Sequence, residues 1–239
     1  MAGTIALVGA GEFLEGMAEV DRYLIGRVPD HPARIVILPT AAGMEDVRPW
    51  TDMGVPHFKR LGASAEPVFV LNGRDADDPL MAHAVRESNF VYMSGGNPGY
   101  LLESLKGSLV WDAIREVYDN GGVIAGCSAG AMVLGTQTRV FRNRQGPTGP
   151  SDWALAPGLN LVSPVIVAPH FNRMTGERLD ALLDQAPEGL IIVGVDEHTA
   201  AVSNGDRWTV MGRGTVALFH GSREPKLYHA DEQFELPTS

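Results

Sequence analysis

A regular alternation of short apolar runs with segments of helical spacing most constrains the fold of this chain. The apolar runs predict buried strands at 4–8, 34–38, 68–71, 90–93 and 123–125. Helices are expected at 17–27, at 47–61 with Pro56 as a kink or break, from Asp78-Pro79 onward and at 109–120. Strands that alternate with helices are joined by crossovers, so neighbouring strands run parallel and helices cover both faces. The sequence therefore predicts an α/β fold with a mostly parallel sheet and helices on both faces.

The second half of the chain departs from this alternation. Residues 136–160 hold arginines at 139, 142 and 144 and then a stretch rich in glycine and proline. They are expected to form a loop or hairpin over the sheet edge, either a solvated surface loop or a lid that contacts substrate. Further on, strands are expected at 161–168 and 190–195, a helix at 177–183 and a hairpin turn at Asn204-Gly205. The chain is thus predicted to form a single domain over residues 1–239, with a β-rich C-terminal extension.

Composition narrows the classes of partner. Of the 239 residues, 44% are hydrophobic and 20% are charged, as expected of a soluble globular protein. The net charge of −10 argues against binding to nucleic acid or to an anionic membrane surface. No apolar run is long enough to span a membrane, and the first apolar segment lacks the basic flank of a signal peptide.

Cys127 is the only cysteine of the chain. No internal disulfide can form, so a reducing, cytoplasmic compartment fits the sequence. We expect neither a metal nor a cofactor, and a homodimer is compatible with the composition.

The segment Gly126-Cys127-Ser128-Ala129-Gly130 joins the fifth predicted strand to a helix expected at 129–134. It has the G-x-S-x-G pattern of a nucleophile elbow, a sharp turn that exposes the serine oxygen. The glycines are needed because a Cβ beside the serine would clash where strand and helix nearly touch. The helix N-terminus also favours negative charge developing beside Ser128. The same pattern occurs by chance in small-residue turns, so catalysis depends on what else converges on Ser128.

Small or glycine-rich segments also follow other predicted strands, at 9–12, 39–43 and 94–98. Ligand sites in parallel sheets lie at the carboxyl ends of the strands, so these segments are expected to surround the elbow. An oxyanion hole needs two backbone N–H groups near the serine. Ala129 can supply one of them, and Gly95 or Gly96 the other.

His170 and Glu197 each follow a predicted strand, so both are expected at the same sheet edge as Ser128. A serine nucleophile needs a base within hydrogen-bond reach, and the base needs an orienting acid. A lone histidine is more often a satisfied core residue, and Asp196 and His198 compete for these roles by adjacency. Alternation along a strand end puts Asp196 and Glu197 on opposite sides, so only one of the two acids should face the site.

Several motifs in this order resemble the peptidase E/cyanophycinase family of serine peptidases. The motifs are Gly9-Ala10-Gly11-Glu12, Ser94-Gly95-Gly96-Asn97, Gly126-Cys127-Ser128-Ala129-Gly130-Ala131, Pro169-His170-Phe171 and the run from Gly194 to Ala200. The resemblance covers residues 4 to about 219. It implies the flavodoxin-like, class I glutamine amidotransferase-like sheet on which that family is built.

The resemblance also implies roles for particular residues. Ser128 would be the nucleophile, His170 the base and Glu197 the orienting acid. Gly96 and Ala129 would be the oxyanion donors. The implied reaction is hydrolysis of a peptide bond next to an aspartyl residue.

The substrate stays open at this stage. Pro98 stands where cyanophycinases carry glutamine, and Arg173 and Arg178 are what is left of an arginine-dense run after the histidine. The alternatives are therefore a short peptide with an acidic residue at the scissile bond and the aspartyl-arginine material of cyanophycinases. For an acidic substrate we expect Arg173 to bind the carboxylate, followed in rank by Arg178 and then by the loop at 139–144. Asn97 is a further candidate for substrate binding.

Three alternatives compete with this interpretation, two of them from other functional classes. A thiol amidotransferase would use Cys127, but the elbow glycines flank Ser128 and turn Cys127 away. An α/β-hydrolase would need His220 or His229 as its base after an acid such as Asp196, and neither histidine sits in a motif. A catalytically inactive amidotransferase-like binding protein would keep only the shape of the site.

Overall fold

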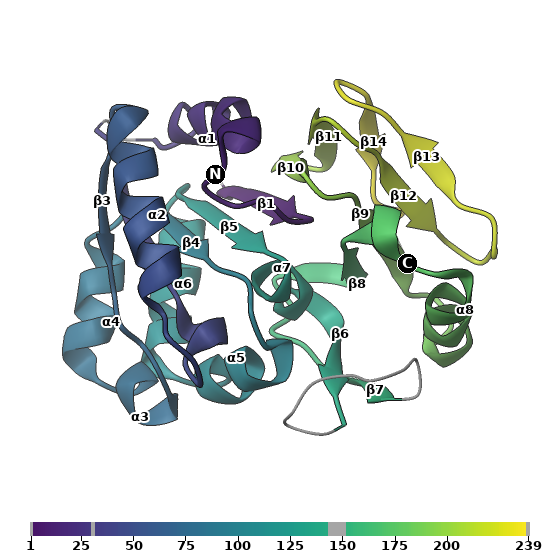
Figure 1. Cartoon of the computed structure of the whole chain (residues 1–239), viewed down its shortest axis with the longest axis horizontal. Helices are drawn as coiled ribbons and strands as arrows, with labels where there is room; N and C mark the ends of the chain where they lie inside the picture. The colour runs from purple at the N-terminus through teal and green to yellow at the C-terminus, as the bar shows by residue number, and fades with distance from the viewer. Residues whose placement is uncertain (1, 30–31, 143–151, 238–239) are drawn as a thin grey trace.

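The computed structural model describes residues 2–29, 32–142 and 152–237, and its strands form two sheets (Figure 1). The larger sheet contains β1 (Thr4–Val8), β2 (Arg34–Leu38), β3 (Ser64–Pro67), β4 (Phe90–Met93), β5 (Val123–Cys127), β10 (Thr199–Asn204), β11 (Arg207–Gly212) and β14 (Gln233–Glu235). The smaller sheet contains β6 (Gly135–Phe141), β7 (Trp153–Pro157), β8 (Val162–Pro169), β9 (Ile191–Val195), β12 (Val216–Phe219) and β13 (Lys226–Tyr228). The α-helices are α1 (Ala18–Ile25), α2 (Arg48–Arg60), α3 (Gly73–Ala76), α4 (Pro79–Arg86), α5 (Pro98–Leu105), α6 (Leu109–Asp119), α7 (Ala129–Val133) and α8 (Gly176–Gln185). Short 3₁₀ turns lie at Glu15–Met17, Thr40–Ala42 and Phe171–Arg173.

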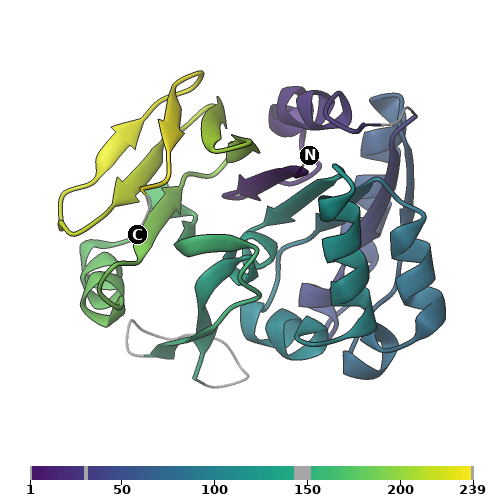
Figure 2. The same ribbon diagram turned by 180° about the vertical axis from the view of Figure 1, so that it is seen from behind.

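The centre of the larger sheet is parallel. Its order is β14-β11-β10-β1-β5-β4-β2-β3, and all neighbours from β1 to β3 pair in parallel. Side chains alternate along β1, so Ala6 and Val8 pack in one core with α1 and α2, while Ile5 and Leu7 pack in another with α4 and α6. Figure 1 shows α2 in front of this sheet, and Figure 2 shows α4 and α6 in front of it from behind. Burial on both faces explains why these strands are continuous apolar runs.

The predicted fold class is confirmed: the chain is α/β, with helices on both faces of a parallel core and a β-rich C-terminal region. The strands nevertheless divide into two sheets where one was expected. The smaller sheet has the order β13-β12-β9-β8-β6-β7, with β6, β8 and β9 parallel. Only Ser128, the short helix α7 and Leu134 separate β5 from β6. A parallel neighbour of β5 would need a crossover of a dozen or more residues, so β6 begins a second sheet instead.

Two local expectations differ from the structure. The strand expected at 68–71 lies earlier, at β3, where the polar residues and Pro67 suit an edge strand. Val68 and Val70 are buried in the core without belonging to a strand, which explains why their pattern misled. Helix α5 was not expected, although Asn97 caps it and Pro98 takes its first position, both common signals of a helix start.

The described part of residues 136–160 contains two paired strands. β6 and β7 pair antiparallel from Gln137 opposite Pro157 to Phe141 opposite Trp153. The connecting residues, Arg144 among them, lie outside the described residues, and the lid role stays a prediction. Among the described helices, none has both the length and the apolar character needed to traverse a bilayer.

Candidate active site

The turn between β5 and α7 holds Ser128 in an unusual backbone conformation, with φ 48° and ψ −109°. Positive φ is uncommon outside glycine, and strained residues of this kind cluster at functional sites. A Cβ added to Gly126 would lie 2.4 Å from the carbonyl of Gly130, and a Cβ added to Gly130 would lie 2.5 Å from the oxygen of Met93. Both glycines of the G-x-S-x-G pattern are therefore required by close backbone contact.

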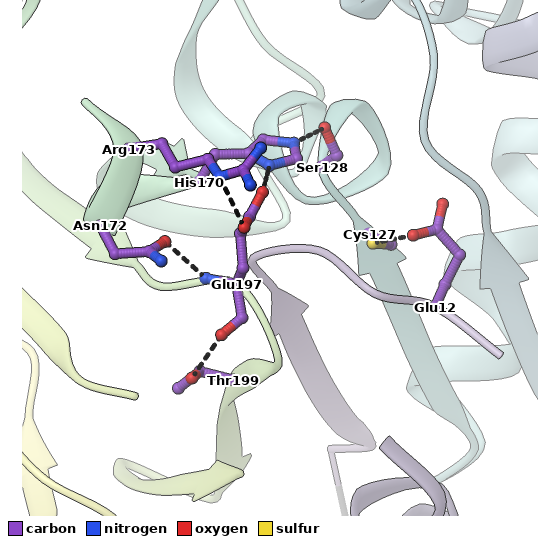
Figure 3. A network of polar contacts seen from close by, with 8 residues as sticks. All are labelled: Glu12, Cys127, Ser128, His170, Asn172, Arg173, Glu197 and Thr199. Atoms are coloured by element: carbon purple, nitrogen blue, oxygen red, sulfur yellow. Dashed lines mark hydrogen bonds and ion pairs between the residues drawn. The ribbon is translucent and has the colours of Figure 1, made fainter. Parts of the chain in front are cut away.

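Ser128, His170 and Glu197 form a chain of hydrogen bonds (Figure 3). Ser128 Oγ lies 3.0 Å from His170 Nε2, and His170 Nδ1 lies 2.9 Å from Glu197 Oε1. β8 and β9 are parallel neighbours with Pro169 opposite Val195, so the residues that follow them emerge side by side. His170 itself is left-handed, with φ 51° and ψ 36°, which turns the chain sharply after β8. If Nδ1 donates to the carboxylate, Nε2 is left to accept the serine proton.

Glu197 is held by side-chain contacts with His170 and Arg173 and by one backbone contact. Its Oε2 lies 3.0 Å from Arg173 Nε, and its backbone N–H donates to Asn172 Oδ1 at 3.0 Å (Figure 3). The hydrogen bond from His170 is the main cause that lowers the pKa of the Glu197 carboxyl, and the charge of Arg173 adds to it. The carboxylate is therefore ionised at neutral pH and available to accept the hydrogen bond from His170 Nδ1.

Asp196 has a different environment. Its Oδ2 accepts hydrogen bonds from Thr215 N at 2.8 Å and Thr215 Oγ1 at 2.9 Å, and the side chain is buried. The two adjacent acids thus point to opposite sides, and Glu197 is the one in contact with His170.

Two backbone amides remain candidates for an oxyanion hole. Ala129 is the first residue of α7, so its N–H has no acceptor within the helix. Gly95 donates its N–H to Glu12 Oε1 at 3.0 Å, which leaves Gly96 as the other candidate. Gly96 is exposed, has φ 142°, and a Cβ there would lie 2.4 Å from the oxygen of Ala41. Only glycine fits that position.

Glu12 is a residue of the site that the sequence did not single out. Its Oε1 accepts the Gly95 N–H and, at 3.2 Å, the Trp50 Nε1–H, while its Oε2 accepts the Cys127 thiol at 2.9 Å. An ideal Cβ on Gly95 would lie 3.4 Å from Ser128 Cβ, so the loop that Glu12 holds lies against the elbow. The sequence signal for it is its position, because Glu12 directly follows the glycine-rich segment Gly9-Ala10-Gly11 at the end of β1.

Cys127 and Ser128 point in different directions, the cysteine toward Glu12 and the serine toward His170 (Figure 3). The thiol is fully buried, and burial, reinforced by the Glu12 carboxylate, raises its pKa well above the ordinary value. A neutral, enclosed thiol is a poor nucleophile. The geometry thus gives no support to a thiol mechanism. Of the histidines weighed as a base, His170 contacts Ser128, while His220 and His229 are exposed.

The predicted substrate-binding residues fall in different places. Asn97 Oδ1 accepts the Tyr100 N–H at 3.0 Å as the cap of α5, and Asn97 also lines a pocket of about 400 Å³ between α5 and β6. Arg173 is three-quarters exposed and pairs with Glu197. Arg178 lies on α8 and acts electrostatically on Arg139 of β6. Within the described residues, no group of three or more metal-ligating side chains comes together.

Comparisons with known proteins give consistent similarities. The model of peptidase family S51 matches residues 5–211, a range that contains Ser128, His170 and Glu197. A cyanophycinase of Trichormus variabilis is 29% identical over 232 residues, covering 95% of this chain and 76% of the relative. The "Probable alpha-aspartyl dipeptidase" of Drosophila melanogaster is 31% identical over 162 residues, covering 64% of this chain and 62% of that protein. The crystal structure of a peptidase from an acI-B1 actinobacterium gives a TM-score of 0.87 at 33% identity, covering 99% of this chain and 98% of that one.

Proposed function

The chain belongs to peptidase family S51 and is a serine-type peptidase or hydrolase, and we propose that Ser128, His170 and Glu197 are its catalytic triad. The observation that carries this proposal is the hydrogen-bonded chain from Ser128 Oγ through His170 to Glu197. Its first member stands on a strained turn at the start of a helix, and its last is an ionised carboxylate. This arrangement has the parts that nucleophilic acyl transfer requires.

The proposed reaction begins when Ser128 Oγ attacks the carbonyl carbon of the scissile peptide bond. His170 Nε2 takes the serine proton, and Glu197 stabilises the imidazolium through Nδ1. The carbonyl oxygen becomes negative and accepts hydrogen bonds from the N–H groups of Ala129 and Gly96. His170 then gives its proton to the leaving amine, which departs and leaves an acyl-enzyme on Ser128. Water, activated by the same histidine, hydrolyses that ester and restores the serine.

For the substrate we propose a short peptide with an acidic residue, most simply aspartate, beside the scissile bond. A protein with a net charge of −10 repels such a substrate unless a local cation receives it. Arg173 and Arg178 lie within eight residues after His170 and supply positive charge on that side of the site. The fully buried free thiol of Cys127 suits the reducing cytoplasm, which is the compartment we propose.

A second candidate is a cyanophycinase-like hydrolase of aspartyl-arginine material. It is favoured by the 29% identity to the Trichormus variabilis cyanophycinase over 95% of this chain. The two candidates share the triad and differ in the substrate that the surrounding surface accepts.

The test compares substrates and variants of the whole chain. Chromogenic anilides of aspartate, asparagine, alanine and leucine are assayed alongside an aspartyl-arginine polymer. Ser128→Ala and His170→Ala should each lower turnover roughly 10⁴-fold, since the triad acts as a unit. Equal cleavage of the aspartyl and leucyl anilides by the wild type would contradict acidic specificity, and preferred release from the polymer would favour the second candidate.

A further inference from the structure

Arg139 on β6 is a buried cation without an acidic partner among the described residues. It is only 6% exposed, and its guanidinium carbon lies 4.4 Å from the centroid of the Trp153 ring on β7. Residues 143–151 contain no aspartate or glutamate in the sequence. Buried arginines are normally paired with an acid, because removing the charge from water is costly.

A second polar group beside this arginine also lacks a partner. The indole Nε1–H of Trp153 is buried and finds no acceptor within the part of the chain that the structure describes. Arg139 stacks on the ring of the same tryptophan, which leaves the edge of its guanidinium free to donate in the plane. The indole N–H is thus a buried donor that needs an acceptor, and an anion bound by the neighbouring guanidinium would supply one.

Arg178 brings a second positive charge to the same place. Arg139 lies opposite Leu155 in the β6–β7 ladder, and Leu155 packs with Leu179 of α8 in one apolar cluster. α8 therefore covers the face from which Arg139 projects. Burial, and then the charge of Arg178, lower the pKa of Arg139 to about 10, so it is still protonated at neutral pH. Two like charges held together favour an anion between them.

The position of Arg139 relates this pair to the active site. In the parallel β6–β8 ladder Gln137 lies opposite Ile166, and Arg139 and Ala168 each come two residues further along their strands, toward the same end of the sheet. Ala168 comes two residues before His170 at the end of β8. Arg178 lies in the first turn of α8, directly after the 3₁₀ turn that follows His170. Both arginines therefore flank the His170 side of the site.

We propose that Arg139 and Arg178, with the Trp153 indole N–H, form the subsite that binds the carboxylate of the substrate. This rests on the proposed acidic-peptide specificity and names the residues that produce it. Arg173 is already paired with Glu197, so the role first expected for it passes to Arg139. A guanidinium fork binds a carboxylate through two parallel hydrogen bonds, which discriminates against the neutral amide. The carboxylate is that of an aspartyl side chain or of the peptide C-terminus.

The experiment measures kcat/KM of Arg139→Met, Arg139→Lys, Arg178→Met and Arg173→Met on aspartyl and asparaginyl anilides. These substrates have no free C-terminus, so they report on the side-chain carboxylate alone. Arg139→Met should lower the aspartyl value roughly 10²-fold and leave the asparaginyl value within threefold, with Arg139→Lys intermediate. Arg178 is exposed, so Arg178→Met should fold normally; it should lose roughly tenfold and tests the site even if Arg139→Met fails to fold. Arg86→Met, which breaks a surface pair with Glu116, is the matched control for loss of one positive charge.

Two further arms separate the outcomes. In one outcome the arginine variants keep the wild-type ratio of kcat/KM for aspartyl and asparaginyl anilides but lose activity on dipeptides with a free C-terminus relative to the dipeptide amides. The subsite then binds the terminal carboxylate. The rate of Ser128 labelling by a fluorophosphonate reports the triad independently of any carboxylate. Suppose that Arg139→Met and Arg178→Met are labelled at the normal rate and keep the wild-type preference for aspartyl over asparaginyl anilides and for dipeptides over their amides. That result would overturn the proposed subsite and leave the proposed triad unaffected. Absent labelling of the wild type would overturn the proposed function itself.

Discussion

Removing the Glu12 carboxylate should lower turnover without abolishing binding. Glu12 Oε1 is the acceptor that holds the Gly95 N–H at 3.0 Å, and Gly96 follows directly in the proposed oxyanion hole. Glu12→Ala releases that loop and also leaves the Trp50 Nε1–H and the Cys127 thiol without their acceptor. We therefore treat Glu12 as a positioning residue that acts through the loop.

The magnitude follows from the contacts. Loss of one oxyanion donor costs about 2.7–4 kcal/mol of transition-state stabilisation, or about 10²–10³ in kcat. A displaced donor retains part of its effect, so Glu12→Ala should lower kcat roughly 10²-fold and leave KM within threefold. Glu12→Gln keeps an oxygen acceptor for Gly95 and Trp50 and loses only the charge, so its kcat should stay within tenfold of the wild type.

Steady-state kinetics on an aspartyl anilide, with melting temperatures measured in parallel, checks this prediction. Cys127→Ala is the matched control, because it removes one partner of Glu12 without touching the loop. It should retain kcat within a few-fold. Equal losses of kcat in Glu12→Ala and Glu12→Gln, or a loss of melting temperature with unchanged kcat, would refute the positioning role.

Three further changes test other parts of the account. Gly130→Ala places a Cβ 2.5 Å from the backbone oxygen of Met93, so we expect it to lower the free energy of unfolding by about 1–3 kcal/mol and to reduce activity. Gly176→Ala is the control: no atom lies within 4 Å of the added Cβ, so chemical denaturation should show unchanged stability. The lowered pKa of Glu197 means that its contribution to stability is present above the ordinary carboxyl pKa and lost as pH falls through the lowered value. The melting temperatures of wild type and Glu197→Gln should therefore differ most at neutral pH and converge in acid, and a constant difference would contradict this. Asp196→Asn weakens two hydrogen bonds to Thr215, so denaturant titration should show a free energy of unfolding lower by about 1–3 kcal/mol, with kcat unchanged. A loss of turnover at full stability would instead assign the catalytic role to Asp196 and not to Glu197.

Much of the fold could be predicted because local patterns determine it. The apolar runs at β1, β2, β4 and β5 are long enough and buried enough to be recognised, and helix caps such as Asp78 mark their own positions. The division into two sheets was not predicted, because it depends on whether the connection through the short helix α7 is long enough to place β6 beside β5 as a parallel neighbour. The third strand was misplaced because burial of Val68 and Val70 gives the same apolar pattern as a paired strand.

The site could be predicted only as far as motifs point to it. Ser128, His170 and Glu197 each end a strand or begin the turn after it, and the pairing of β8 with β9 brings the last two together. The contacts of Glu12 and Arg139 depend on side chains from distant segments. The spacing of Arg173 from His170 predicts a contact with substrate, which stays a prediction, whereas its ion pair with Glu197 could not be read from the sequence.

The central claim is that Ser128 is the nucleophile, and covalent labelling tests it most directly. The wild-type protein is treated with a fluorophosphonate probe, digested, and analysed by mass spectrometry to locate the modified residue. We predict one adduct on Ser128, absent in Ser128→Ala, much slower in His170→Ala and retained in Cys127→Ala. An adduct on Cys127 or on another residue, or labelling that persists in Ser128→Ala, would contradict the account.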